Sequence, residues 1–182
     1  MLLVVAMMKG DARVLMDILA LSGRPYENNL NKAMDTFREG AYDYLVTFDH
    51  DNVPKNNPID LVFLDKDIIG MPYLGMRFNE KRQMEMAFLA MDLKENGEYL
   101  DHKVMSGLQE VDAIASGAMV IARRVAEDKD MFFAREWDEK GFATRGVDFN
   151  FCKKAKEKGF SVWAHYDYPA SHFKEVDLLD LI

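Results

Sequence analysis

The sequence has one cysteine, Cys152, among its 182 residues. A single thiol excludes an intrachain disulfide, and we therefore expect a reducing, cytoplasmic location. Long apolar runs are also absent, because the run at residues 1–8 is too short to span a bilayer. That run lacks the basic start and the small-residue cleavage site of a signal peptide. The sequence therefore predicts no membrane span and no secretion.

Positive charge is scarce, with 23 Lys and Arg against 31 Asp and Glu and a net charge of -8. Nucleic acids and anionic membranes bind clustered basic side chains, so this balance argues against both as partners. Linkers rich in Pro, Gly or Ser, internal repeats and low-complexity tracts are missing too. With 49% apolar residues, the chain has the composition of a globular protein, and we expect one domain over residues 1–182.

Apolar patterns along the chain predict alternating strands and helices. Residues 12–21 suit either a helix or a buried strand, and residues 81–96 have helical composition. The remaining expected elements are strands at 2–8, 43–48, 67–73 and 160–166, and helices at 27–40, 57–64 and 147–158. Residues 110–124 are expected to form one or two strands broken by Gly117. The strand at 43–48 is apolar on both sides, as are fully buried strands of parallel sheets. This order predicts an α/β fold with a mostly parallel central sheet flanked by helices.

The apolar strand at 43–48 runs directly into two aspartates, Asp49 and Asp51. Side chains alternate along an extended chain, so both carboxylates face one side and His50 faces the other. In open α/β sheets this end of a strand is where ligands bind. Two carboxylates there either share a divalent cation such as Mg²⁺ or Mn²⁺, or they cap the following loop through hydrogen bonds to its backbone. The spacing alone leaves both interpretations open.

Four segments occur in an order that resembles a known enzyme family. They are "YLVTFDHDNVP" at 44–54, "VDAIASGAMVIARRVAE" at 111–127, "RGVDFNFCKKAKEKGFSVWAHY" at 145–166, and "SHF" at 171–173. Together they resemble the family 2-like glycosyltransferases of the GT-A fold, including short phage and prokaryotic members, over residues 26–175. The resemblance implies transfer of a sugar from a nucleoside-diphosphate sugar to a hydroxyl of a glycan, lipid or protein. It favours inversion at the sugar carbon.

The resemblance also implies roles for individual residues. Asp51 and His172 would hold Mn²⁺ or Mg²⁺, and Asp49 would contact the metal indirectly or the ribose of the donor. The "ASG" segment, with Ser116 and Gly117, would line the donor-sugar pocket, where a glycine lets a substrate approach the backbone or simply marks a strand bulge. Asp148 would be the general base that accepts the proton of the acceptor hydroxyl.

Two departures from the family pattern leave other functions open. Val147 stands where the family has an acidic residue before the base, and only about 25 residues precede the helix that carries Asn29, a candidate donor-binding residue. We therefore expect a shortened N-terminus, and a homo-oligomer or a partner protein could complete it. One alternative is a degenerate, non-catalytic binding domain. The other is a phosphohydrolase of the haloacid dehalogenase type, with Asp49 as nucleophile and Asp51 as acid/base, although its Ser or Thr after the next strand is missing.

Overall fold

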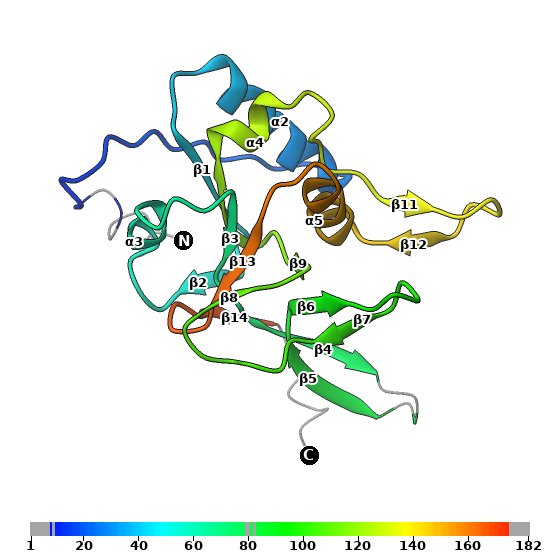
Figure 1. Ribbon diagram of the computed structural model, residues 1–182. Helices are drawn as coiled ribbons and strands as arrows, with labels where there is room; N and C mark the ends of the chain where they lie inside the picture. The colour runs from blue at the N-terminus through cyan, green and yellow to red at the C-terminus, as the bar shows by residue number, and fades with distance from the viewer. Residues whose placement is uncertain (1–7, 9, 79–80, 82, 175–182) are drawn as a thin grey trace.

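The computed structural model describes residue 8, residues 10–78, residue 81 and residues 83–174. Figure 1 shows the arrangement of the helices and strands. The helices are α2 (Tyr26–Glu39), α3 (Ile59–Val62), α4 (Arg123–Glu127) and α5 (Val147–Glu157). The strands are β1 (Tyr44–Phe48), β2 (Asn52–Pro54), β3 (Ile68–Gly70), β4 (Leu74–Phe78), β5 (Met84–Phe88), β6 (Ala90–Leu93), β7 (Tyr99–Asp101), β8 (Leu108–Glu110), β9 (Ala113–Ile114), β10 (Ala118–Ala122), β11 (Glu136–Trp137), β12 (Ala143–Arg145), β13 (Val162–His165) and β14 (Ala170–His172).

A five-stranded sheet with the strand order β1-β10-β3-β13-β8 forms the centre of the molecule. Only β3 and β13 pair in parallel, while the other three pairings in this sheet are antiparallel. The remaining strands form small antiparallel sheets. The predicted mostly parallel sheet flanked by helices, and with it the GT-A fold class, is therefore wrong. The central sheet is mixed, and small antiparallel sheets surround it.

The error has a physical cause in the buried strands. In β10, Met119 and Ile121 face one hydrophobic cluster, while Ala118 and Val120 face another on the opposite side of the sheet. A strand in the middle of a sheet covered on both faces is apolar throughout, whichever direction its neighbours run. Continuous apolar character therefore reports position within the sheet and not the direction of pairing.

The prediction for the strand that ends at the carboxylates is partly confirmed. Residues 44–48 do form a strand, but β1 lies at one end of the strand order and all five of its residues are half-buried. It pairs with β10 alone in the central sheet, in the register that places Phe48 opposite Ala118. The expected full burial of this strand is therefore wrong.

Three of the predicted helices are present, and they pack on the sheet as their apolar faces require. In α2, the residues Leu30, Met34 and Phe37 are buried, at the spacing of one helix face. They join a cluster that also contains residues of α4 and α5. Figure 1 shows α2 beside α4, with α5 against the neighbouring part of the sheet. No helix formed by the described residues has the length and apolar character needed to cross a membrane.

Two other predicted segments differ from the structure. Residues 12–21 form neither helix nor strand, because only Val14 and Met16 pack against a cluster while Leu15 is fully exposed. Residues 81–96 are not helical: they contain β5 and β6, each paired in antiparallel fashion with a neighbour. The alternation of Met84, Met86 and Phe88 along one side of β5 matches a strand period, which outweighs helical composition. The strand expected at 2–8 lies almost wholly outside the described residues.

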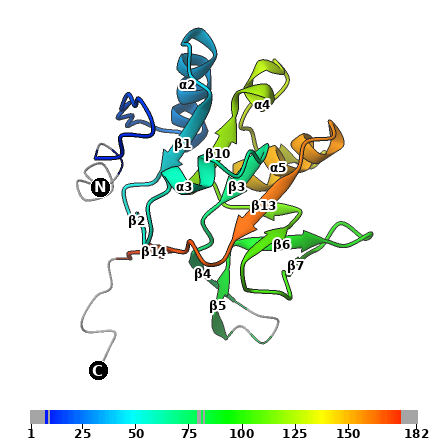
Figure 2. The ribbon, with the colours of Figure 1, turned by 60° about the vertical axis from the view of Figure 1, so that its left-hand side comes forward.

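Hairpins extend from the body of the molecule. Figure 2 shows β4, β5, β6 and β7 away from α2 and α4, at the other end of the structure. The β4–β5 hairpin presents exposed Leu74, Met76, Met84 and Met86 on one face. A separate two-stranded sheet joins β2 to β14, and it brings the end of the described chain back to the segment that follows β1.

Candidate active site

Pairing of β1 with β10 places Asp49 beside the "ASG" segment. The Asp49 backbone N–H donates to the Gly117 carbonyl at 2.9 Å, one step beyond the last residue pair of the two strands. The Asp49 side chain accepts a hydrogen bond from the Tyr26 hydroxyl at 2.8 Å, and that hydroxyl lies 3.2 Å from Ser116 Oγ. Three segments that are distant in the sequence therefore meet around Asp49.

Pairing of β2 with β14 brings Asp51 and His172 together. The register sets Asn52 opposite His172, and the Phe173 backbone N–H donates to the Asp51 carbonyl at 2.8 Å. His172 Nε2 lies 3.4 Å from Asp51 Oδ2, and Lys174 Nζ lies 2.6 Å from the same oxygen. The two metal ligands implied by the sequence resemblance are thus neighbours in the structure.

The other ring nitrogen of His172 is held by the backbone. His172 Nδ1 lies 2.8 Å from the Leu74 carbonyl oxygen, which can only accept a hydrogen bond. Nδ1 therefore donates this hydrogen bond, and Nε2 is the ring nitrogen that lies beside Asp51. A backbone carbonyl on the distal nitrogen is the common support for a metal-binding histidine. Tyr73 packs edge-on against this ring with the ring centroids 4.9 Å apart, which limits its rotation.

Asp148 lies in the first turn of α5 and reaches the same "ASG" segment. Its carboxylate accepts hydrogen bonds from the backbone N–H of Phe149 at 2.9 Å and of Ser116 at 3.4 Å. Burial raises the pKa of Asp148, the two backbone donors oppose that rise, and the nearby charge of Asp49 adds to it. A carboxylate with a raised pKa is a stronger base than an exposed aspartate, as a general base requires.

The two carboxylates of the doublet differ in their electrostatic state. Burial raises the pKa of Asp49, the Tyr26 hydrogen bond lowers it, and the charge of Asp51 raises it again. Burial also acts to raise the pKa of Asp51, but the hydrogen bond and charge of Lys174 together with His172 bring that pKa below its usual value. In the part of the chain that the structure describes, Asp49 and Asp148 have no ion-pair partner, so a cation nearby would relieve the cost of their burial.

Gly117 is surrounded by polar side chains. A Cβ placed on it would lie 2.2 Å from Asn52 Nδ2, 2.5 Å from the Tyr73 hydroxyl and 2.8 Å from Asp49 Oδ2. Its backbone N–H donates to the Tyr73 hydroxyl at 3.2 Å. The glycine is therefore required by close packing of these three groups, since the space beside its Cα is already occupied.

Asn52 is 2% exposed, and neither atom of its amide makes a hydrogen bond. Burial and the charges of Asp148 and Asp49 raise the pKa of Tyr73, while the Gly117 backbone N–H and the nearby Asn52 amide act to lower it. Asp49, Tyr73 and Asn52 thus form one polar cluster around Gly117.

These donors suit a divalent cation that is completed by its substrate. No group of three or more His, Cys, Asp or Glu side chains that could hold a metal occurs among the described residues. Asp51 and His172 supply one carboxylate oxygen and one imidazole nitrogen, a pair that Mn²⁺ accepts. Phosphate oxygens and water commonly fill the remaining positions when a cation binds with a nucleotide. The two side chains therefore fit a divalent cation as a pair of ligands, and the cation would need further ligands from outside the described residues.

One predicted site residue does not join the cluster. The Asn29 amide donates to the Gly23 carbonyl at 3.1 Å, at the turn before α2. Tyr26, on the same helix, is the residue that contacts Asp49. Tyr26, Tyr73 and Lys174 were not among the site residues predicted from the sequence. A tyrosine in "MPYLG" and a lysine two residues after "SH" carry no pattern that separates them from ordinary surface or core residues.

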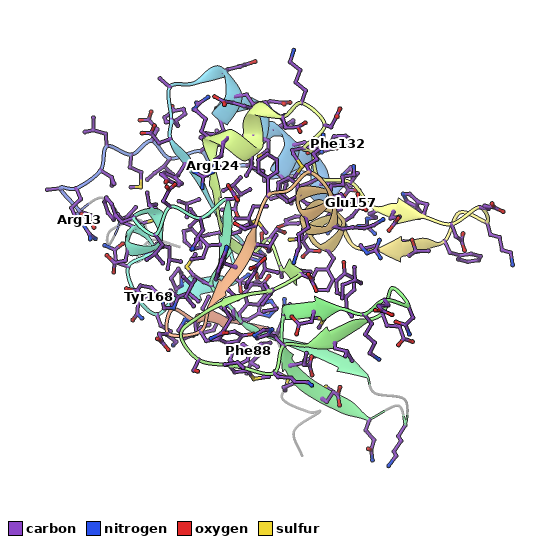
Figure 3. The ribbon with its side chains drawn as sticks, in the orientation of Figure 1. Arg13, Phe88, Arg124, Phe132, Glu157 and Tyr168 are labelled. Carbon is purple, nitrogen blue, oxygen red and sulfur yellow. The ribbon has the colours of Figure 1, made fainter. Side chains whose placement is uncertain are left out.

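A surface hollow lies at the opposite end of β1 and is not part of this cluster. Its lining includes Asp43, Tyr44 and Arg124. Figure 3 labels Arg124, which forms ion pairs with Asp65 and Asp67. Its guanidinium is therefore engaged by neighbouring carboxylates, and the hollow offers no comparable set of reactive groups.

Comparisons with known proteins establish the fold of this chain without assigning a family. No protein-family model matches it, and no curated protein matches it significantly. Among solved structures it is similar to the crystal structure of A197 from STIV, with a TM-score of 0.54 and 21% sequence identity. The similarity covers 86% of this chain and 72% of A197. At this level of identity the similarity shows a shared fold and nothing about activity.

Proposed function

We propose that this chain transfers a sugar from a nucleoside-diphosphate sugar to an acceptor hydroxyl with the help of Mn²⁺ or Mg²⁺. The observation that carries the proposal is the contact of Asp51 Oδ2 with His172 Nε2 at 3.4 Å. These residues are far apart in the sequence, and the family resemblance assigns both of them to the metal site. The proposal is supported further by Asp148 and Ser116, which lie at the same cluster.

The chemistry assigned to the cation is Lewis-acid stabilisation of the negative charge that gathers on the departing diphosphate. Asp51 and His172 would hold the cation. Leu74 would fix the tautomer of His172, as the hydrogen bond to its carbonyl indicates. Asp49 would hold the ribose or the outer shell of the cation, and its orientation is set by the Tyr26 hydroxyl.

Asp148 is the group proposed to move the proton. The acceptor oxygen attacks the anomeric carbon, the bond between that carbon and the diphosphate oxygen breaks, and the hydroxyl proton passes to the Asp148 carboxylate. Attack from the face opposite the leaving group inverts the anomeric carbon. The Ser116 and Phe149 backbone donors orient the carboxylate, while burial keeps it basic.

A thermal-shift series with several nucleoside-diphosphate sugars, each with and without Mn²⁺, tests the proposal. We expect one donor to raise Tm only when Mn²⁺ is present, since a ligand that binds the native state alone stabilises it. Asp51→Ala should abolish this metal-dependent shift. Asp35→Ala is the control because Asp35 is an exposed residue of α2 whose side chain pairs with Arg38. If Asp51→Ala responds to donor and metal as the parent does, the proposed metal site is wrong.

One observation favours a non-catalytic binding domain as the second candidate. Val147, which stands where the family resemblance has an acidic residue, is 8% exposed and belongs to the main hydrophobic cluster. A carboxylate at that position would be buried among apolar side chains. Donor binding with no sugar transfer to any acceptor, by the parent as well as by Asp148→Asn, would support this candidate. Turnover of a generic phosphate ester would instead support a phosphohydrolase.

A further inference from the structure

One oxygen of Asp51 has two nitrogen neighbours. Lys174 Nζ lies 2.6 Å from Asp51 Oδ2, while His172 Nε2 lies 3.4 Å from it. The 2.6 Å distance is that of a close charge-assisted hydrogen bond. Asp51 Oδ2 is also the oxygen that faces His172, so a cation held by both residues would have to bind beside this same atom.

Lys174 and a divalent cation cannot both occupy that place. An ammonium group next to Oδ2 would repel a doubly charged ion and would take the lone pairs that the ion needs. The side chain of Lys174 is 46% exposed, whereas that of Asp51 is 20% exposed. A lysine with a flexible four-carbon stem and a half-exposed head can leave its partner and regain water at little cost.

We propose that Lys174 is a built-in substitute for the divalent cation, occupying the cation's place at Asp51 until the metal displaces it. This inference rests on the metal site of the proposed function. In the metal-free protein the ammonium gives Asp51 a counter-charge and keeps its carboxylate oriented toward His172. Lys174 therefore lowers the affinity for the metal, because each binding event must first break the ion pair.

The test is the affinity of the purified protein for Mn²⁺, measured by calorimetry and by the loss of the free-Mn²⁺ electron paramagnetic resonance signal. We expect Lys174→Gln to bind Mn²⁺ about fivefold more tightly than the parent, as follows from the loss of a half-exposed ion pair. Lys174→Arg keeps the positive charge and should bind Mn²⁺ no more tightly than the parent. Melting curves for each variant report that the fold is retained.

A matched control separates local competition from a change in net charge. Lys158 is a half-exposed lysine that also pairs with aspartates, at 2.8 Å from Asp128 and 3.0 Å from Asp130, at the far end of α5. Lys158→Gln removes the same charge but should leave Mn²⁺ affinity unchanged. In an Asp51→Asn background the effect of Lys174→Gln should disappear, because the shared partner is gone.

The outcomes distinguish this inference from the proposed function. If the parent binds Mn²⁺ and Lys174→Gln binds it equally or more weakly, the substitute role is wrong while the metal site stands. If Lys158→Gln tightens binding as much as Lys174→Gln does, the effect is one of net charge and the inference also fails. If neither the parent nor Lys174→Gln binds Mn²⁺, the metal site fails and the inference fails with it.

Discussion

Replacing Gly117 with alanine is expected to disturb the site by a single methyl group. Gly117 does not have a left-handed φ, so alanine meets no backbone strain there and the effect is purely steric. The new Cβ would lie 2.2 Å from Asn52 Nδ2 and 2.5 Å from the Tyr73 hydroxyl. Both distances are far below van der Waals contact, and both groups are buried, so neither can move aside freely. Insertions of this kind cost about 2 kcal/mol.

For a chain of this size, that loss lowers Tm by roughly 4–8 °C, which thermal and urea unfolding would both detect. A second substitution tests the cause: Asn52→Ala removes the nearest obstructing atom, so the double variant should lose about 1 kcal/mol less than the sum of the two single variants. Strict additivity, or a Gly117→Ala variant as stable as the parent, would refute the packing argument.

Mn²⁺ affinity should fall in the Gly117→Ala variant as well, since Asp49 Oδ2 lies 2.8 Å from the added carbon.

Three further predictions concern single side chains. Asp148→Asn should retain donor binding in calorimetry while losing sugar transfer. The rate of sugar transfer by the parent should rise with pH through a midpoint above the ordinary aspartate pKa of about 3.9, because burial raises the pKa of Asp148. His172→Ala should weaken Mn²⁺ binding at least about tenfold, whereas the control His165→Ala, on β13, should leave Mn²⁺ binding unchanged. Equal losses of Mn²⁺ affinity in both variants would count against His172 as a metal ligand. Burial alone would raise the pKa of Asp67, but hydrogen bonds from Ser161 and Arg124 lower it below its usual value. Asp67→Asn should therefore reduce the free energy of unfolding by about 2 kcal/mol at pH 7. Because a lowered folded-state pKa stabilises only the ionised carboxylate, unfolding curves should show this difference from the parent fading as pH falls below about 4.

The sequence predicted local elements well where one physical rule dominates. Residues 147–158 have a single apolar face, and a glycine, Gly159, follows them, so α5 was predicted within one residue of its end. The break at Gly117 between β9 and β10 was also predicted. Residues 81–96 were misjudged because charged and methionine-rich segments suit both helix and exposed strand, and the hairpin partner that decides between them lies in β4.

Strand direction and site partners depend on contacts that no local pattern reports. The order of the central sheet follows from which apolar faces meet, so β1 could be recognised as a strand but not as one at the end of the sheet. The doublet and His172 could be nominated from their order along the chain. Tyr26 and Lys174 could not, because a tyrosine hydroxyl and a lysine become part of a site only through where the fold places them.

The short ladder between β2 and β14 joins two segments that are separated by most of the chain. Each strand has three residues, so the ladder alone offers few hydrogen bonds against the entropy of closing such a long loop. Asp51 and His172 belong to the two segments that this ladder joins, and an ion bound by both would link these segments. Amide protons of residues 170–173 should then exchange with deuterium more slowly when Mn²⁺ is added, because binding of the ion would also stabilise the pairing of β14 with β2.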